Sequence, residues 1–189
     1  MKTKIISRAA LFLAALFFSL PALAMETELG VDVNYFDPTN DVLRDFYKSG
    51  VSYGLNNHLW WGNGFGLGTD FEYFSATRAY AGDHFVLNAF SLESCFLYSL
   101  RGDRLLRPYL GAGISLNYGQ DRNKDGGKTA RDFEFGYLLN AGLEFKVKWF
   151  RPYIQIGYRT LPGAEQGIDL SGWITGLGIN FGLPAKKPN

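Results

Sequence analysis

Apolar and polar residues alternate along most of the chain, in eight separate runs. In the first run, Leu29, Val31 and Val33 fall on one face. Asp32 and Asn34 fall on the other. Because successive side chains of a strand point to opposite faces, this period predicts strands with one apolar and one polar face. The runs cover residues 28–35, 51–58, 65–73, 86–98, 110–118, 133–145, 154–159 and 172–182.

Short and long connections alternate between these runs. Among the short ones, Asn63-Gly64 can supply the positive φ angles that a tight hairpin needs. Two strands open on the same triplet, Arg107-Pro108-Tyr109 and Arg151-Pro152-Tyr153. We therefore predict a series of hairpins in one domain. The short connections are 62–64, 101–103 and 149–152, and the longer polar ones are 37–49, 75–84, 120–131 and 161–170.

The first residues have the features of a secretory signal peptide. Three basic residues among the first eight precede an apolar run over residues 9–20, and the small-residue triplet Ala22-Leu23-Ala24 follows. This pattern predicts export, with cleavage after Ala24. The predicted division of the chain is 1–24 as signal peptide, 25–183 as barrel and 184–189 as a periplasmic tail.

Composition argues against several functional classes. Charged residues make up 20% of the 189 residues, and the net charge of +1 gives no reason to expect a nucleic-acid partner. Cys95 is the only cysteine, so an internal disulfide and a cysteine-based zinc site are both excluded. No stretch after the signal peptide reaches the roughly 18 apolar residues of a helical membrane span.

Alternation alone leaves two barrels open, a soluble carrier with its apolar face inside and a membrane barrel with that face outside. The polar face consists mainly of Gly, Ser and Asn, which suits the tight interior of a small barrel. Aromatic residues also gather near the strand ends, as at the two interfaces of a membrane barrel. We therefore predict that Leu110, Ile114 and Leu116 point outward. The predicted interface aromatics are Tyr35, Trp60, Trp61, Tyr73, Tyr98, Tyr118, Trp149, Tyr158 and Trp173.

The signal peptide, the eight amphipathic runs and the Arg-Pro-Tyr-Leu-Gly-Ala-Gly segment at 107–113 resemble the small outer-membrane β-barrels of Gram-negative bacteria. That group includes the OmpA transmembrane domain, OmpX and the opacity-type proteins. Gly178, Phe181 and Leu183 resemble the assembly signal of the family, although this chain continues through residues 184–189. The resemblance implies an all-β, eight-stranded, antiparallel up-and-down transmembrane barrel, inserted by the barrel assembly machinery. We expect a monomer in contact with outer-membrane lipid and lipopolysaccharide.

The inward face carries a set of ionisable residues. Acids outnumber bases, so we expect Arg159 to lie among carboxylates. A network of ion pairs and water would fill the narrow interior as a plug. A narrow path for ions or small apolar molecules is the alternative. The predicted interior network is Glu28, Asp32, His58, Asp70, Glu72, Glu93, Glu134, Glu144, Lys146 and Arg159.

One loop motif resembles a calcium loop. Asp121, Asn123 and Asp125 alternate before Gly126, and Asp132 stands at the twelfth position. Asp at the last position reaches less far than Glu, and basic residues lie nearby, so a solvated hairpin loop is the stronger interpretation. We expect no cofactor, with weak calcium binding as the alternative.

Catalysis has little support in the sequence. Lipid A deacylases of this size use a His-x-Ser pair near the penultimate strand, but residues 158–162 contain no histidine. We therefore expect a structural or surface-interaction role through the longer loops. The apolar periodicity in the loop at 37–49 fits a short helix at the lipopolysaccharide headgroups, an adhesive patch, or a loop folded onto the barrel rim, and we favour the last.

Overall fold

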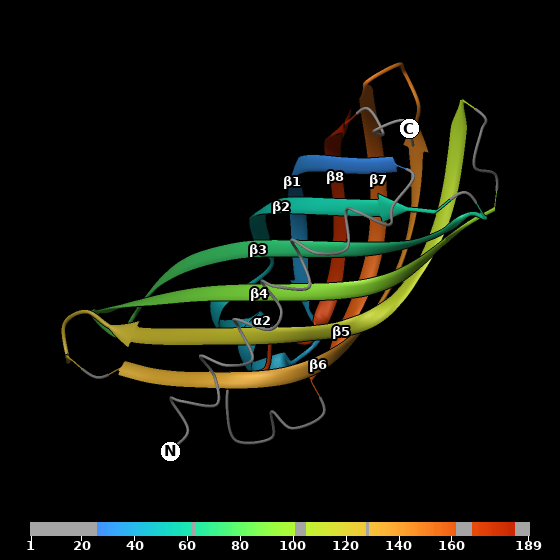
Figure 1. Ribbon diagram of the computed structural model, residues 1–189. Coiled ribbons are helices and arrows are strands. Elements are labelled where there is room, and N and C mark those ends of the chain that lie inside the picture. Colours follow the sequence, from blue (N-terminus) through green and yellow to red (C-terminus); the bar gives the residue numbers. More distant parts are fainter. Residues whose placement is uncertain (1–25, 62, 101–104, 128, 162–167, 184–189) are drawn as a thin grey trace.

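A computed structural model describes residues 26–61, 63–100, 105–127, 129–161 and 168–183 of the chain (Figure 1). Eight strands form one closed barrel in which each strand pairs antiparallel with its neighbours in sequence, and β1 pairs with β8. The predicted fold class is confirmed. The elements are β1 (Glu26–Pro38), α2 (Asp41–Tyr47), β2 (Gly50–Trp60), β3 (Phe65–Tyr80), β4 (Asp83–Ser99), β5 (Leu106–Asn123), β6 (Thr129–Phe145), β7 (Phe150–Thr160) and β8 (Gly172–Leu183).

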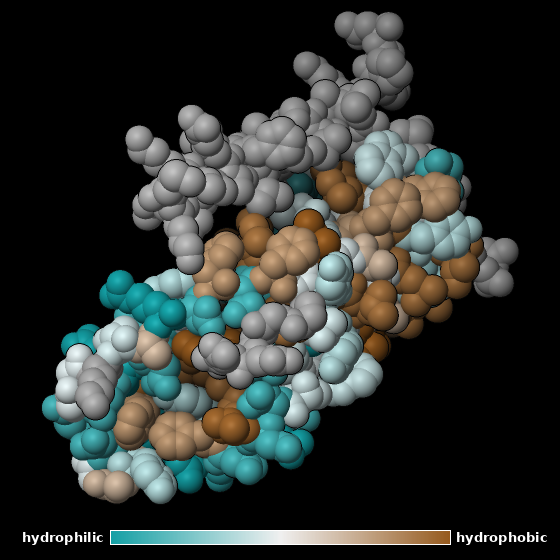
Figure 2. Space-filling view, turned by 90° about the horizontal axis from the view of Figure 1, so that it is seen from below, coloured by the Kyte–Doolittle hydropathy of each residue, from teal (hydrophilic) through white to brown (hydrophobic). Residues whose placement is uncertain are grey.

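The apolar face of the barrel points outward. The side chains of Leu110 and Ile114 are 54% and 41% exposed, whereas Ser115 between Ile114 and Leu116 is fully buried. This orientation excludes the soluble carrier. In Figure 2, hydrophobic residues cover much of the visible barrel wall, and hydrophilic residues gather at one end. Among the described residues, no helix has the length and hydrophobicity of a membrane span.

The barrel wall is taller on one side. β3, β4, β5 and β6 have 16 to 18 residues each, whereas the other four strands have 11 to 13. The prediction of loops at 75–84 and 120–131 is therefore wrong, because the strands continue through most of both segments. Backbone pairing persists there although the hydrophobic alternation fades. We call the paired segments 75–80, 83–88, 120–123 and 129–131 the β3–β6 extension; it projects beyond the barrel in Figure 1.

Helix α2 folds into the mouth of the barrel beside this extension. The Asn40 side chain accepts a hydrogen bond from the Leu43 amide at 3.1 Å and so caps the first turn. The helix turns Leu43 and Tyr47 into an apolar cluster and leaves Val42 exposed. The segment 37–49 thus folds onto the rim, as in the favoured interpretation, but it also contains the short helix of the alternative. We call this cluster the apolar cap; it comprises Phe36, Leu43, Tyr47, Phe74, Leu87, Ala89, Leu161, Leu170 and Ile174.

Candidate functional site in the barrel interior

Buried ion pairs fill the end of the barrel opposite the apolar cap. Glu28, at 0% exposure, accepts hydrogen bonds from both Arg107 and Arg151, and from the Trp60 indole at 3.1 Å. Arg107 also pairs with Glu144. These charge-assisted hydrogen bonds meet on one buried carboxylate of β1 and so fix the positions of β1, β2, β5 and β7 relative to one another. We call this group the ionic cluster; it comprises Glu26, Glu28, Arg107, Glu144, Lys146 and Arg151.

The two arginines come from the repeated triplet. Arg107 lies near the start of β5 and Arg151 near the start of β7, and both side chains turn inward. The tyrosine two residues later, Tyr109 or Tyr153, falls on the same buried face because side chains alternate in a strand. Neither arginine is among the predicted interior residues. The repeated Arg-Pro-Tyr triplet is the feature of the sequence from which their inward position could have been predicted.

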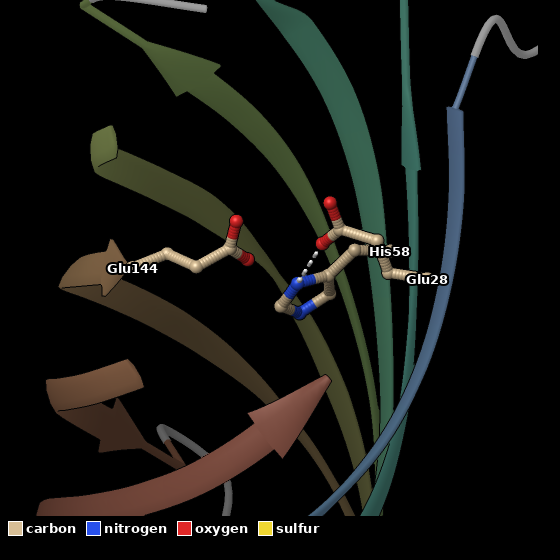
Figure 3. A group of neighbouring side chains, drawn as sticks. All are labelled: Glu28, His58 and Glu144. Carbon is tan, nitrogen blue, oxygen red and sulfur yellow. Dashed lines mark ion pairs between the residues drawn. The ribbon is translucent and has the colours of Figure 1, made fainter. Parts of the chain in front are cut away.

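Glu28, His58 and Glu144 converge in the middle of this cluster, with potential ligand atoms within 4.8 Å of one another. Figure 3 shows the His58 ring between the two carboxylates, with its Nδ1 3.8 Å from Glu28. A divalent cation does not fit there, because Arg107 and Arg151 already bind Glu28, and three acids face three bases in the ionic cluster.

A small polar chamber lies between the ionic cluster and the apolar cap. Asp32 accepts hydrogen bonds from Asn56 and from the Tyr153 hydroxyl, both at 3.0 Å. Asp70 lies 3.9 Å from His58 Nε2. The chamber lined by both aspartates has a volume of about 20 Å³, enough for about one water molecule. The chamber between the two aspartates is therefore little larger than one water molecule.

Arg159 lies among carboxylates, as expected. Its guanidinium donates to Glu72 at 3.1 Å, to Glu93 at 2.9 Å and to the Ser91 hydroxyl at 2.7 Å. It also donates to the Leu170 carbonyl at 3.2 Å, which ties the ion pairs to the apolar cap. Glu134 lies only partly buried on β6, outside this group.

The predicted interface aromatics lie at the two ends of the outer wall, with one exception. Trp60 departs from the prediction: its side chain is 3% exposed and lies inside the barrel. The Arg107 guanidinium carbon is 4.2 Å from the centroid of the Trp60 ring, a cation–π contact. The reason is the strand period, since Trp60 follows inward-facing His58 by two residues. On the outer wall lie Tyr35, Trp61, Tyr73, Tyr98, Tyr118, Trp149, Tyr158 and Trp173, exposed to different degrees.

The predicted assembly signal lies on β8. Phe181 and Leu183 point outward with substantial exposure, whereas Gly178 faces inward. A Cβ atom on Gly178 would lie 2.6 Å from the Tyr153 ring, so the glycine leaves room for that tyrosine. Recognition of this strand by the barrel assembly machinery stays a prediction.

The residues of the calcium motif each engage a different part of the protein. Asp121 accepts from the Tyr47 hydroxyl at 2.6 Å, and Asp125 accepts from the His84 amide at 2.6 Å. Asp132 accepts from the Ile168 amide at 3.2 Å, and Asn123 closes a local turn. Burial and the bond to Asp121 raise the pKa of Tyr47, so its hydroxyl stays a donor. The motif ties α2 and neighbouring hairpins together.

These separate contacts carry a prediction for calcium. We expect protease cleavage of the hairpin turn at 124–127 to be unchanged by calcium at concentrations up to ~10⁻³ M, the range in which extracellular modules bind it. To bind one calcium ion together, the carboxylates would have to give up their present hydrogen-bond donors. Limited proteolysis of the folded protein with and without calcium measures this. Protection that disappears in Asp125→Asn would contradict it.

Comparisons with known proteins agree with this architecture. The family model for the outer membrane protein beta-barrel domain matches residues 10–181. OprG of Pseudomonas aeruginosa is 13% identical with a TM-score of 0.67, and the match covers 86% of this chain and 97% of that one. Neisserial surface protein A is 14% identical with a TM-score of 0.63, covering 82% and 96%. Ail, the attachment invasion locus protein of Yersinia pestis, is 14% identical with a TM-score of 0.58, covering 85% and 99%.

At these identities the solved structures show the same fold and nothing finer. No curated protein sequence matches the chain.

Proposed function

The chain belongs to the outer membrane protein β-barrel family, and on that premise we propose that it is a closed, non-conducting barrel that acts through surfaces outside the hydrocarbon layer. The protein is located in the bacterial outer membrane. In such barrels the short turns face the periplasm and the longer connections face outward. The β3–β6 extension and α2 would therefore stand at the cell surface.

The observation that carries this proposal is the filling of the barrel by three successive layers. The ionic cluster occupies the periplasmic end, a chamber of about 20 Å³ lies above it, and the apolar cap packs into the opposite mouth. Ions cross a barrel only where a continuous hydrated lumen exists. Among the described residues, each layer contains large buried side chains, Arg107 below and Phe36 above.

The proposal predicts that the purified protein gives no stable conductance steps in planar bilayers. Leu43→Ala loosens the apolar cap but leaves the ionic cluster in place, so we expect this variant to remain silent as well. Steady steps from the unmodified protein would overturn the proposal in favour of a narrow channel. A difference in gel mobility between heated and unheated samples checks that each preparation is folded.

A catalytic role finds no support in the described residues. The side-chain contacts of His58 are with carboxylates, Asn180 and aromatic rings, and His84 contacts Asp125. Neither arrangement presents a hydroxyl or thiol nucleophile to a base. We therefore propose a structural and surface-interaction role, with a monomer as the expected state.

A further inference from the structure

An arginine without a partner lies on the inner face of the β3–β6 extension. Arg78 follows Phe74 and Ala76 on the face of β3 that turns toward the apolar cap, since side chains alternate along a strand. Its Nε atom is buried without a hydrogen-bond acceptor. Within the described part of the chain its guanidinium forms no ion pair, whereas Arg159, deeper in the barrel, binds two carboxylates. A buried N–H group without an acceptor costs free energy, so an acceptor from outside would be bound favourably.

Three aromatic rings lie beside this arginine. Phe85 is its direct partner in the register of β3 and β4, and Tyr80 is two residues further along the same face. Phe46 of α2 contacts both rings, with its centroid 5.8 Å from that of Tyr80 and 5.2 Å from that of Phe85. The helix thus adds the third ring of an apolar surface next to the guanidinium. We call these four residues the aromatic–arginine patch: Phe46, Arg78, Tyr80 and Phe85.

The outer end of this patch is held rigidly and is open to solvent. Tyr80 is 61% exposed and pairs with Asp83 across a turn of two residues. Ala81 and Gly82 both have positive φ, as the tightest hairpin turns require. Tyr80 is therefore presented by a regular hairpin. Tyrosine and arginine are among the residue types that contribute most to binding energy in protein–protein interfaces.

The charges around the patch favour a single carboxylate as the group that Arg78 binds. Asp83 and Asp121 lie on the same inner face of the extension, whereas Arg122 and Arg131 lie on its outer face. A polyanion at Arg78 would therefore approach these two carboxylates and be repelled by them. Membrane lipid contacts the outer wall, and the patch faces the barrel mouth. One carboxylate matches the guanidinium fork in a bidentate way.

We propose that the aromatic–arginine patch binds an exposed segment of an extracellular protein in which an acidic residue stands next to an aromatic one. The carboxylate would bind Arg78, and the ring would lie against Tyr80 and Phe46. A protein segment meets both requirements because it carries the charge and the apolar group on adjacent side chains. The inference names the partner class of the proposed surface role and rests on the position of the extension at the cell surface.

A blocked aspartyl-phenylalanine dipeptide is the probe for this site, and blocked asparaginyl-phenylalanine is its neutral counterpart. Each is titrated into the isotope-labelled, folded chain in detergent micelles, and the dissociation constants are read from the shifts of nuclear magnetic resonance signals. We expect the acidic dipeptide to bind about ten-fold more tightly, because a hydrogen bond to a charged group is stronger than one to an amide. The signals of Arg78, Tyr80 and Phe46 should shift together.

Two substitutions separate the two halves of the patch. Arg78→Gln should weaken binding of the acidic dipeptide about ten-fold and leave the neutral dipeptide unchanged. Tyr80→Ala should weaken both dipeptides to the same extent, because it removes the apolar contact only. Arg122→Gln is the matched control, since Arg122 is an exposed arginine on the outer face of the same extension. It should bind both dipeptides as the unmodified chain does.

The inference is overturned if the two dipeptides bind the unmodified chain equally, or if Arg78→Gln and Arg122→Gln have the same effect. Tighter binding of a sulfated disaccharide that depends on Arg78 would assign the patch to polyanions and would also overturn it. The amide spectrum of each variant shows whether it is folded. Because bilayer conductance is measured separately, a failure here would leave the closed barrel standing.

Discussion

Replacing Glu28 by Gln is expected to lower the free energy of unfolding by about 3–5 kcal/mol, because removal of one partner from a buried ion pair leaves uncompensated charge. Glu28 is fully buried and accepts from Arg107, Arg151 and Trp60 at once. The amide keeps the shape of the side chain but can no longer neutralise either arginine. Urea unfolding in lipid micelles, followed by tryptophan fluorescence, measures the loss.

Glu134→Gln supplies the comparison for that experiment. Glu134 is also a carboxylate on a strand, but it is partly exposed and lies outside the ionic cluster. Substitutions at such positions change stability by only about 0.5 kcal/mol. If Glu28→Gln proved no more destabilising than Glu134→Gln, the ionic cluster would not be what holds β1 to β5 and β7.

A second large effect is expected at Gly113, where we predict that alanine lowers the free energy of unfolding by about 3 kcal/mol and reduces the folded yield. A Cβ atom there would lie 2.0 Å from the Ser94 carbonyl oxygen and 2.7 Å from Cys95 Cα. Both atoms belong to the backbone of β4, so no side chain can rotate away. The strands themselves would have to separate.

Gly157→Ala is the matched substitution. Gly157 is another inward glycine, on β7, but its added Cβ would come no closer than 3.3 Å to the Leu139 carbonyl oxygen. We expect a change of less than about 1 kcal/mol, because alanine also restricts the unfolded chain. Equal losses at the two glycines would show that an added methyl group on the inner face is destabilising in general, and that the close approach of β4 does not explain the loss at Gly113. Unfolding curves and folded yields of both variants decide between these explanations.

The faces of the strands followed from the sequence because a strand has a fixed side-chain period. Leu110 and Ile114 lie on one face of the strand and Ser115 on the other, as their alternation indicates, and the apolar face is the outer one. The same rule would have placed Trp60 beside His58 inside the barrel. The prediction of Trp60 as a lipid-facing aromatic was wrong, because the side-chain period of the strand, and not the residue type, decides which face a residue occupies.

The membership of the interior network was partly predictable, but its pairing was not. Alternation places Glu28 and Arg159 inside, and the excess of acids indicates that Arg159 meets carboxylates. It does not say that Arg107 and Arg151 both reach Glu28, because β5 and β7 are not hydrogen-bonded neighbours of β1. That contact crosses the lumen and depends on the curvature and register of the closed barrel.

The sequence by itself determined the all-β fold and the strand order, since both follow from local periodicity and short hairpin connections. The outward direction of the apolar face was indicated by the small residues of the polar face and by the aromatic residues near the strand ends. Only the tertiary structure decided that β3 to β6 continue beyond the other four strands and that α2 fills the mouth of the barrel. These features depend on the pairing register between strands and on packing across the barrel. Neither is encoded in the hydrophobic pattern of any one segment.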